Sequence, residues 1–448
     1  MKFRVRVLVP AIVTVVCLAA FAKDFRLSGY VHSVHDRSFE LNGVQVNCEP
    51  GTVIEPPAGA ESGKIPPSCK WIRVGDHVLV SGELTSASSV LKAKRIVIDP
   101  ITIESKVRNL ALIESAPQLV KSGNGWSGEL YVDGRTLQIT PATKLSFDEP
   151  STNTGSGQQI SPLQSVEQVG PNVYVAYEAV PSYEGKLEAT QLIFSVNDTT
   201  AAELDFRKRE DPQVQLPDYV SKVPGIVEIG SKDKYFIRPD KAMQERVKQV
   251  GLRLIPEFQR EMPESNPGKL HFQFWVIDSK NSFTMSSSNG LVMIPESLVS
   301  RFKNDAQLAA ALSFSIAQIV QEQEFRYRDR RELQRILGWT SIAGSFLSPA
   351  ASLAGLVNSG TLARFLRLQN EQAVRVGMDY MRRAGFDIRE TGPAWAATRN
   401  KPIDAGDAQV ALGRYAFDEI RRYHFQDDFD SLRINLDVSA GSLSTLAK

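Results

Sequence analysis

Residues that could hold a catalytic metal are scarce in the second half of this 448-residue chain. No cysteine follows Cys69, and the only histidines beyond residue 217 are His271 and His424, which do not share a helical turn. Metal-dependent peptide hydrolysis typically uses two histidines four residues apart on one helix, with an adjacent glutamate that activates water. A zinc site here would have to be rebuilt from other donors. The acidic donors left for it are Glu322, Glu324 and Glu371.

Cys48 and Cys69 flank a stretch at 49–68 that is rich in glycine and proline. Two cysteines without nearby histidines make a poor zinc site. In an oxidising compartment they would instead close a loop by forming a disulfide. We therefore predict a Cys48–Cys69 disulfide.

The first 22 residues have the pattern of a secretory signal peptide. Lys2, Arg4 and Arg6 precede an uncharged run at 7–21, and the small-residue pattern at 20–22 is typical of a cleavage site. The run is short for a membrane span, which needs about 20 apolar residues. We expect cleavage and a periplasmic or secreted protein, with membrane association as the alternative.

The composition is that of an ordinary globular protein. Apolar residues make up 42% of the chain and charged residues 23%, and the length allows two or three domains. The 52 basic residues nearly balance the 51 acidic ones, which does not favour nucleic acid as a partner.

The first half of the chain is predicted to be β. Short alternating runs of Val, Ile, Tyr and Phe are separated by Gly, Pro, Asn and Ser clusters. We predict two small β-barrel modules, at 23–100 and 101–196. They loosely resemble the oligonucleotide/oligosaccharide-binding type of barrel, a likeness that implies no ligand.

An internal repeat supports the tandem arrangement. The segment 74–80 resembles 169–175, an offset of 95 residues, and each is followed by a comparable strand. Upstream of each lies a hairpin with an Asn-Gly or Asp-Gly turn, a strong short-range signal for two paired strands. These hairpins are Phe39–Val46 and Leu130–Leu137.

The second half changes to a helical period. A polar segment at 197–216 is predicted to be a linker, and an apolar stripe from Met243 to Ile255 indicates a helix. Two extended segments follow, and the remainder reads as helical. The predicted fold class is α+β, with a mainly helical domain and a small sheet at 217–448.

Several segments of this domain, in order and spacing, resemble the HtpX-like zinc metallopeptidases, the family that includes the CAAX prenyl endopeptidases. Asn281–Met285 and Gly290–Ile294 resemble the two strands that precede the family's metal-binding helix. Asp305–Leu312 resembles the start of that helix, and Gln369–Gly377 its second helix. The resemblance implies a zincin-like fold and zinc endopeptidase activity.

The residues that carry the family's chemistry are replaced in this chain. The resemblance places Phe314 and Gln318 at the two histidines, Ser315 at the glutamate, Gln372 at the third zinc ligand and Val374 at a nearby aspartate. Phenylalanine cannot bind a metal, an amide is a feeble zinc ligand, and serine is no base near neutral pH. We therefore expect a degenerate member without zinc or any other cofactor, a pseudopeptidase.

The work that we expect of such a domain is binding, because a peptide can add to an exposed sheet edge without any metal. The family's edge strand corresponds here to Asn289, Gly290, Leu291, Val292, Met293 and Ile294. The expected partner is an extended polypeptide or a protein. Two alternatives stay open: a metalloendopeptidase with a rebuilt site, and an envelope protein that binds through its β modules. The uncharged segment at 338–357 is expected to form two short helices broken at Pro349 and packed on the domain, or a flap over the cleft, with contact to a membrane surface as the alternative.

Overall fold

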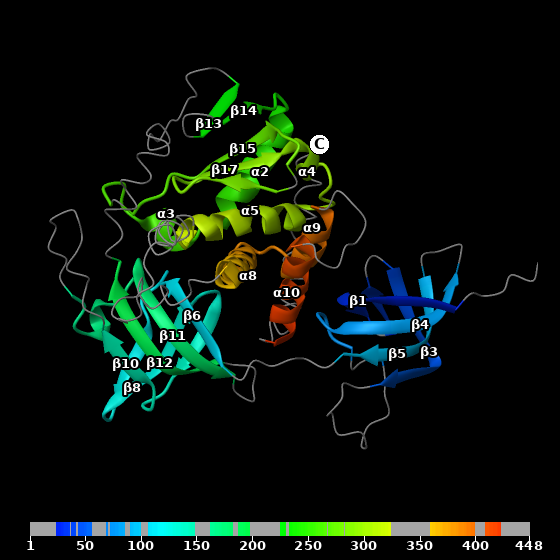
Figure 1. The fold of residues 1–448 in the computed structure, drawn as a ribbon, viewed down its shortest axis with the longest axis horizontal. Coiled ribbons are helices and arrows are strands. Elements are labelled where there is room, and N and C mark those ends of the chain that lie inside the picture. The colour runs from blue at the N-terminus through cyan, green and yellow to red at the C-terminus, as the bar shows by residue number, and fades with distance from the viewer. Residues whose placement is uncertain are drawn as a thin grey trace, which may run out of the picture.

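The computed structural model describes residues 24–55, 69, 72–85, 90–99, 106–147, 162–181, 187–197, 225–229, 233–323, 359–398 and 408–422, apart from residues 36, 42, 43, 267 and 282. The predicted signal peptide at 1–22, the linker beyond Asn197 and the uncharged segment at 338–357 lie outside the described residues. The described chain is a mixed α+β protein, with β modules first and helices toward the C-terminal end (Figure 1).

Five strands close into an N-terminal barrel, module 1, in the order β1-β2-β3-β5-β4. Alternate residues such as Val78 and Val80 fill its interior, because successive strand residues point to opposite faces. Cys48 and Cys69 form the predicted disulfide, with their Cα atoms 6.3 Å apart. The strands are β1 (Asp24–His35), β2 (Ser38–Leu41), β3 (Val44–Glu55), β4 (His77–Thr85) and β5 (Val90–Ile98).

Seven strands form a second sheet, module 2, in which β10 pairs with β12 beside the main path β6-β11-β12-β9-β8-β7. A bridge between Ile113 and Val132 joins the β6 end of this path to β8, the strand before the other end. Asp133 and Gly134 both have positive φ in the β8–β9 turn, as the Asp-Gly signal predicts. The strands are β6 (Val107–Leu112), β7 (Gln118–Ser122), β8 (Gly125–Val132), β9 (Arg135–Ile139), β10 (Lys144–Phe147), β11 (Val173–Pro181) and β12 (Leu187–Val196).

The two modules share strand pairing and register. Val46 pairs in parallel with Leu91 in module 1, and Leu137 pairs in the same way with Leu187 in module 2. A threonine contact is also repeated, because the hydroxyls of Thr52 and Thr143 each donate to a carbonyl oxygen of the last strand at 2.7 Å. Module 2 is therefore a second copy of the module 1 fold.

One part of the predicted repeat is wrong by two residues. The sequence pattern aligns Gly75 with Gly170, but the structural equivalent of Gly75 is Asn172, 97 residues later. Both have positive φ, 87° and 69°, and their N–H groups donate to the carbonyls of Val31 and Ile113, which are themselves equivalent. A shift of two residues leaves the inward and outward alternation of a strand unchanged, so the hydrophobic pattern could not detect it.

The third part combines a five-stranded sheet with helices. Helix α5 is buried on almost every side, which explains its uniformly apolar and small residues. It packs against the sheet, α2 and α8. The strands are β13 (Ile226–Ile229), β14 (Asp233–Ile237), β15 (Gln273–Asp278), β16 (Met285–Ser286) and β17 (Leu291–Pro295). The helices are α2 (Lys241–Leu254), α3 (Glu257–Glu261), α4 (Glu296–Val299), α5 (Asp305–Val320), α8 (Ser359–Arg383), η3 (Ile388–Glu390), α9 (Thr391–Ala397) and α10 (Ala408–Arg422).

The predicted edge strand at Asn289–Ile294 is not at the edge. The sheet order is β13-β14-β15-β17-β16, so β17 lies between β15 and β16. Met285 and Ser286 of β16 pair antiparallel with Met293 and Val292. The outer position on this side of the sheet therefore belongs to β16.

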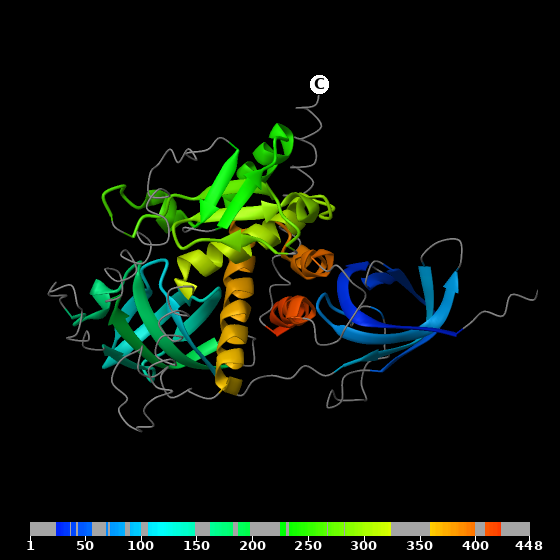
Figure 2. The ribbon, with the colours of Figure 1, turned by 45° about the horizontal axis from the view of Figure 1, so that its top comes forward.

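The β modules lie on two sides of the helical part. In both views α8 and α10 lie between module 2, drawn in cyan and green, and module 1, drawn in blue (Figures 1 and 2). Within the described part of the chain, no helix has the length and apolar character needed to cross a membrane.

Candidate functional site

The helix pair α5 and α8 carries the five positions at which the resemblance places catalytic residues. The two helices approach closely at Gly377, where an added Cβ atom would lie 3.0 Å from Ser313 Oγ and 3.1 Å from the backbone nitrogen of Phe314. A small residue is needed here because larger side chains would separate the helices.

Phe314 lies in the apolar core. Its side chain is only 9% exposed and contacts Trp395 of α9 edge to face, with ring centroids 4.8 Å apart. Such aromatic pairs add about 0.5–1.5 kcal/mol to the stabilisation from burial. Phe314, which the resemblance places at the first histidine, is therefore a packing residue.

Ser315 and Gln318 make local polar contacts. The Ser315 hydroxyl donates to Thr284 Oγ1 at 2.7 Å, which connects α5 to the segment that leads into β16. The Gln318 amide lies 3.5 Å from Asn370 Oδ1 on α8, at the limit of a hydrogen bond. Both positions hold neutral groups that bind neutral partners.

Gln372 is directed toward module 2. Its amide nitrogen donates to the Leu110 carbonyl at 3.1 Å and to Asp133 Oδ1 at 3.0 Å, and its amide oxygen accepts from Gln323 at 3.1 Å. Val374 is 2% exposed and belongs to the core. Gln372, which the resemblance places at the third zinc ligand, thus serves as a contact between two parts of the chain.

Zinc does not fit this donor set. The three positions that the resemblance assigns to zinc ligands carry a phenyl ring and two amides, and the Gln372 amide oxygen already accepts a hydrogen bond. Over the described ranges, no group of three or more His, Cys, Asp or Glu side chains is arranged to hold a metal.

The donors considered for a rebuilt site are dispersed. His271 lies 3.5 Å from Glu264, and Glu371 lies 3.5 Å from Arg367. Glu322 accepts hydrogen bonds from Tyr174 and Asn197 of module 2. Glu324 and His424 lie outside the described residues.

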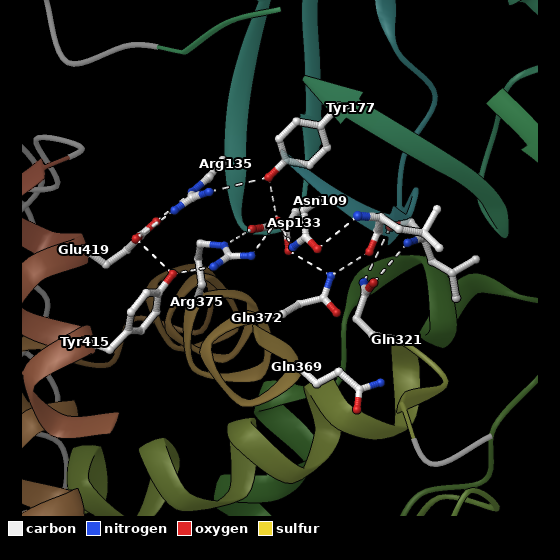
Figure 3. A network of polar contacts seen from close by, with 12 residues as sticks. Asn109, Asp133, Arg135, Tyr177, Gln321, Gln369, Gln372, Arg375, Tyr415 and Glu419 are labelled. Atoms are coloured by element: carbon white, nitrogen blue, oxygen red, sulfur yellow. Dashed lines mark hydrogen bonds and ion pairs between the residues drawn. The ribbon is translucent and has the colours of Figure 1, made fainter. Parts of the chain in front are cut away.

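A buried polar network lies between module 2 and α8, with Asp133 at its centre (Figure 3). Asp133 Oδ2 accepts from Arg375 at 2.5 Å, from the Tyr177 hydroxyl at 2.6 Å and from Asn109 at 2.7 Å. Its other oxygen accepts from Gln372. The side chains of both members of the ion pair are almost completely buried, at 0% and 5% exposure. A buried pair of this kind needs such additional donors to offset its desolvation.

The charge balance of the network keeps Asp133 ionised. Burial alone would raise the pKa of this carboxyl, but the guanidinium groups of Arg375 and Arg135 and the surrounding donors hold its pKa below the ordinary value. The network therefore carries a carboxylate rather than a neutral acid at neutral pH.

The network extends to α10. Arg135 of β9 donates to both oxygens of Glu419, at 2.7 and 2.9 Å, a bidentate pair with both side chains buried. Tyr415 donates to Glu419 at 3.0 Å and also contacts Arg375. Module 2 is consequently attached to two helices through one connected set of charges.

A second buried contact contains a perturbed acid. Glu114, just after β6, accepts from the Tyr380 hydroxyl at 2.6 Å and from Gln321 at 3.3 Å. Burial raises the pKa of Glu114 to about 7, and the nearby Asp379 carboxylate adds to the effect. This carboxyl changes its charge near neutral pH inside an interface.

The interface between module 2 and the helices is not among the sites predicted from the sequence. Local patterns give Asp133 only the role of a turn residue and do not single out Arg375. One signal is present: Gln372, Arg375 and Asp379 recur every three or four residues along α8, a polar stripe on a helix that is otherwise apolar at its centre. The partners of Gln372 and Arg375 lie in β6 and in the β8–β9 turn, more than 200 residues earlier, which no local pattern reveals.

The N-terminal module matches a known family. A family model described as "Domain of unknown function (DUF5666)" matches residues 28–97, which correspond to module 1. Five strands of module 2 repeat the pairing of the matched segment, and β7 and β10 are added to them.

Proposed function

We propose that this chain is an exported, metal-free relative of the HtpX-like peptidases that binds extended polypeptide without hydrolysing it. The proposal rests on one observation above the others. Gln372, at the position of the third zinc ligand, holds module 2 through Leu110 and Asp133. A residue committed to this contact is not available to a metal.

The packing around Phe314 supports the same conclusion. Phe314 packs against Trp395 and offers no donor atom to a metal, and Ser315 bonds to Thr284. The donor chemistry of the helix pair therefore supports a binding role more strongly than a hydrolytic one.

The edge strand β16 is the surface best suited to an extended peptide. The N–H of Ser287 donates to the Leu291 carbonyl, so the N–H of Ser286 points to the opposite, outer side, because backbone groups alternate along a strand. Phe283 is 39% exposed beside it and offers an apolar contact. Strand addition uses such backbone groups together with neighbouring side-chain contacts.

Zinc content and proteolysis test the inactive assignment. Protein purified without chelators should contain no stoichiometric zinc and should leave unstructured casein intact. Chelator-sensitive cleavage with one zinc per chain would instead establish a metalloendopeptidase with a rebuilt site.

Peptide binding tests the proposed surface. A fluorescent extended peptide should bind the protein, and Ser286→Pro should weaken binding because it removes an outward N–H. Ser286→Ala, which keeps the N–H, is the matched control and should bind as the unmodified chain does. Binding that is equal in all three proteins would point to the β modules, and no binding in any of them would remove the proposal.

A further inference from the structure

The two faces of the edge strand β16 differ in chemistry. Met285 pairs with Met293 and packs on the side of the sheet away from α5, where Leu291 and Met293 are completely buried. Ser286 pairs with Val292, so its side chain lies on the opposite side, which faces α5. A strand added next to β16 would therefore meet an apolar surface on one side and a polar one on the other.

The polar side and the backbone of β16 complete this surface. On the polar side, Thr284 accepts a hydrogen bond from the Ser315 hydroxyl of α5 at 2.7 Å. The N–H of Ser287 pairs inward, so the N–H and the carbonyl of Ser286 both point outward and can bond to one residue of an added strand. Such an edge suits a strand in which apolar and polar residues alternate.

The chain itself carries a segment of this kind after α10. Four apolar residues alternate with three polar ones at 432–438, a segment that lies outside the described residues. Strict alternation predicts a strand with one apolar face, and neither glycine nor proline interrupts it. The apolar residues are Leu432, Ile434, Leu436 and Val438, and the polar ones are Arg433, Asn435 and Asp437.

The length of chain between α10 and this segment allows it to reach β16. Helix α10 packs on α9, α9 packs on α5, and α5 contacts β16. Packed helices lie about 8–10 Å apart, so these layers place the axis of α10 within about 30 Å of β16. The connecting residues 423–431 can themselves extend over about 30 Å.

We propose that the segment 432–438 adds to β16 as a further strand and occupies the peptide-binding edge in the free protein. Its apolar residues continue the surface of Met285, and its polar residues face Ser286 and α5. The inference rests on the proposed function, because it gives the same edge a competitor within the chain. An external peptide must displace a segment whose attachment gives it an effective concentration of about a millimolar.

Fluorescence anisotropy with a labelled copy of residues 430–440 measures this competition. A chain that ends at His424 keeps every described residue and should bind the probe at least about tenfold more tightly than the full chain. Ser286→Pro in the shortened chain should abolish the gain, because the outward N–H is lost. Ser286→Ala in the shortened chain is the matched control and should keep the gain.

Two single substitutions test the alternation in the full chain. Ile434→Lys places a charge on the apolar face of the segment, so this variant should bind the probe as tightly as the shortened chain does. Asn435→Lys changes the polar face and is the matched control, which should bind as the unmodified chain does. Hydrogen exchange at the Ser286 amide should be about tenfold slower in the unmodified chain and in Asn435→Lys than in the shortened chain.

Equal affinity of the full and shortened chains for the probe would overturn the proposal. A difference that depends on protein concentration would also overturn it, because the segment would then come from a second copy. An unrelated extended peptide tests the proposed function separately. If it binds both chains equally and Ser286→Pro weakens it, the edge binds peptides but the chain's own segment does not occupy it. If neither probe binds either chain, both the occupancy and the peptide-binding function fail.

Discussion

Asp133, in the tight turn between β8 and β9, forms a buried ion pair with Arg375 at the centre of α8, with 2.5 Å between carboxylate oxygen and guanidinium nitrogen. The turn itself touches the helix, since a Cβ atom on Gly134 would lie 2.7 Å from the Arg375 carbonyl oxygen. The glycine thus serves both the turn conformation and the close approach. The contact makes Asp133 one of several groups that fix module 2 on the helices, beside Arg135 with Glu419 and Glu114 with Tyr380.

Asp133→Asn should destabilise the protein by about 3–5 kcal/mol, because it leaves Arg375 buried without its counter-charge. Asparagine tolerates the positive φ at this position, so the turn is preserved. Urea unfolding at pH 7 would measure the loss. Glu129→Gln, an exposed carboxylate on the same hairpin, is the control and should change stability by no more than about 0.5 kcal/mol. Equal stabilities of the two variants would contradict the assigned role of the ion pair.

Gln372→Glu should not create a zinc ligand but should destabilise the interface by about 3 kcal/mol. The new carboxylate would replace the amide donor 3.0 Å from Asp133 Oδ1 and 3.1 Å from the Leu110 carbonyl. Acid should reduce the effect, because the introduced carboxyl would again be neutral once it is protonated. Thermal melts at pH 5 and pH 8 with zinc analysis would test this expectation.

Glu114→Gln should remove a pH dependence of stability. The pKa of Glu114 is raised in the folded protein to about 7 from an ordinary 4.5. The stability that this carboxyl contributes is therefore fully present below about pH 4.5 and is lost as the pH rises through 7. At pH 8 the variant should exceed the unmodified protein by about 3 kcal/mol, with little difference at pH 4.5. Urea titrations at both pH values, with exposed Glu188→Gln as control, would show whether the difference is specific to this position.

Phe314→Ala should cost about 3–5 kcal/mol, because it leaves a cavity against Trp395 and removes the aromatic contact. Phe283→Ala, a phenylalanine that is 39% exposed, should cost about 1 kcal/mol or less. Calorimetry of the two variants compares a buried and an exposed ring directly. Similar losses in both would mean that Phe314 does not fill the core.

Local patterns predict much of the fold. Alternation and turn signals correctly predict the barrel of module 1 and the Asp133-Gly134 turn, and the two cysteines indicate their disulfide. The same alternation places part of the repeat two residues out of register, since strand patterns cannot distinguish shifts of two. The edge of the sheet is misassigned because the resemblance gave the outer place to Asn289–Ile294, whereas the two residues of β16 pair outside that strand.

The interface could not be predicted in the same way. Each of its members has an ordinary local explanation: Asp133 as a turn residue, Arg135 as a strand residue, and Glu419 as a polar residue on a helix. These residues form one ion-pair network only in the folded protein, where β9, α8 and α10 lie next to one another. From the sequence, the residue types at Phe314, Ser315, Gln318 and Gln372 indicate that ligands for zinc are absent from these positions. They do not indicate that Gln372 donates to Leu110 and Asp133 of module 2.

The length of chain between these partners also constrains how the protein folds. Asp133 and Arg375 are separated by 242 residues, and Arg135 and Glu419 by 284. Contacts this distant in sequence form slowly, because a long loop must close before they stabilise anything. A chain that emerges from its N-terminus can complete the barrel of module 1, with its disulfide, well before α10 exists. Module 2 is made before its helical ion-pair partners, so its contact between Arg135 and Glu419 can form only after α10 has been made.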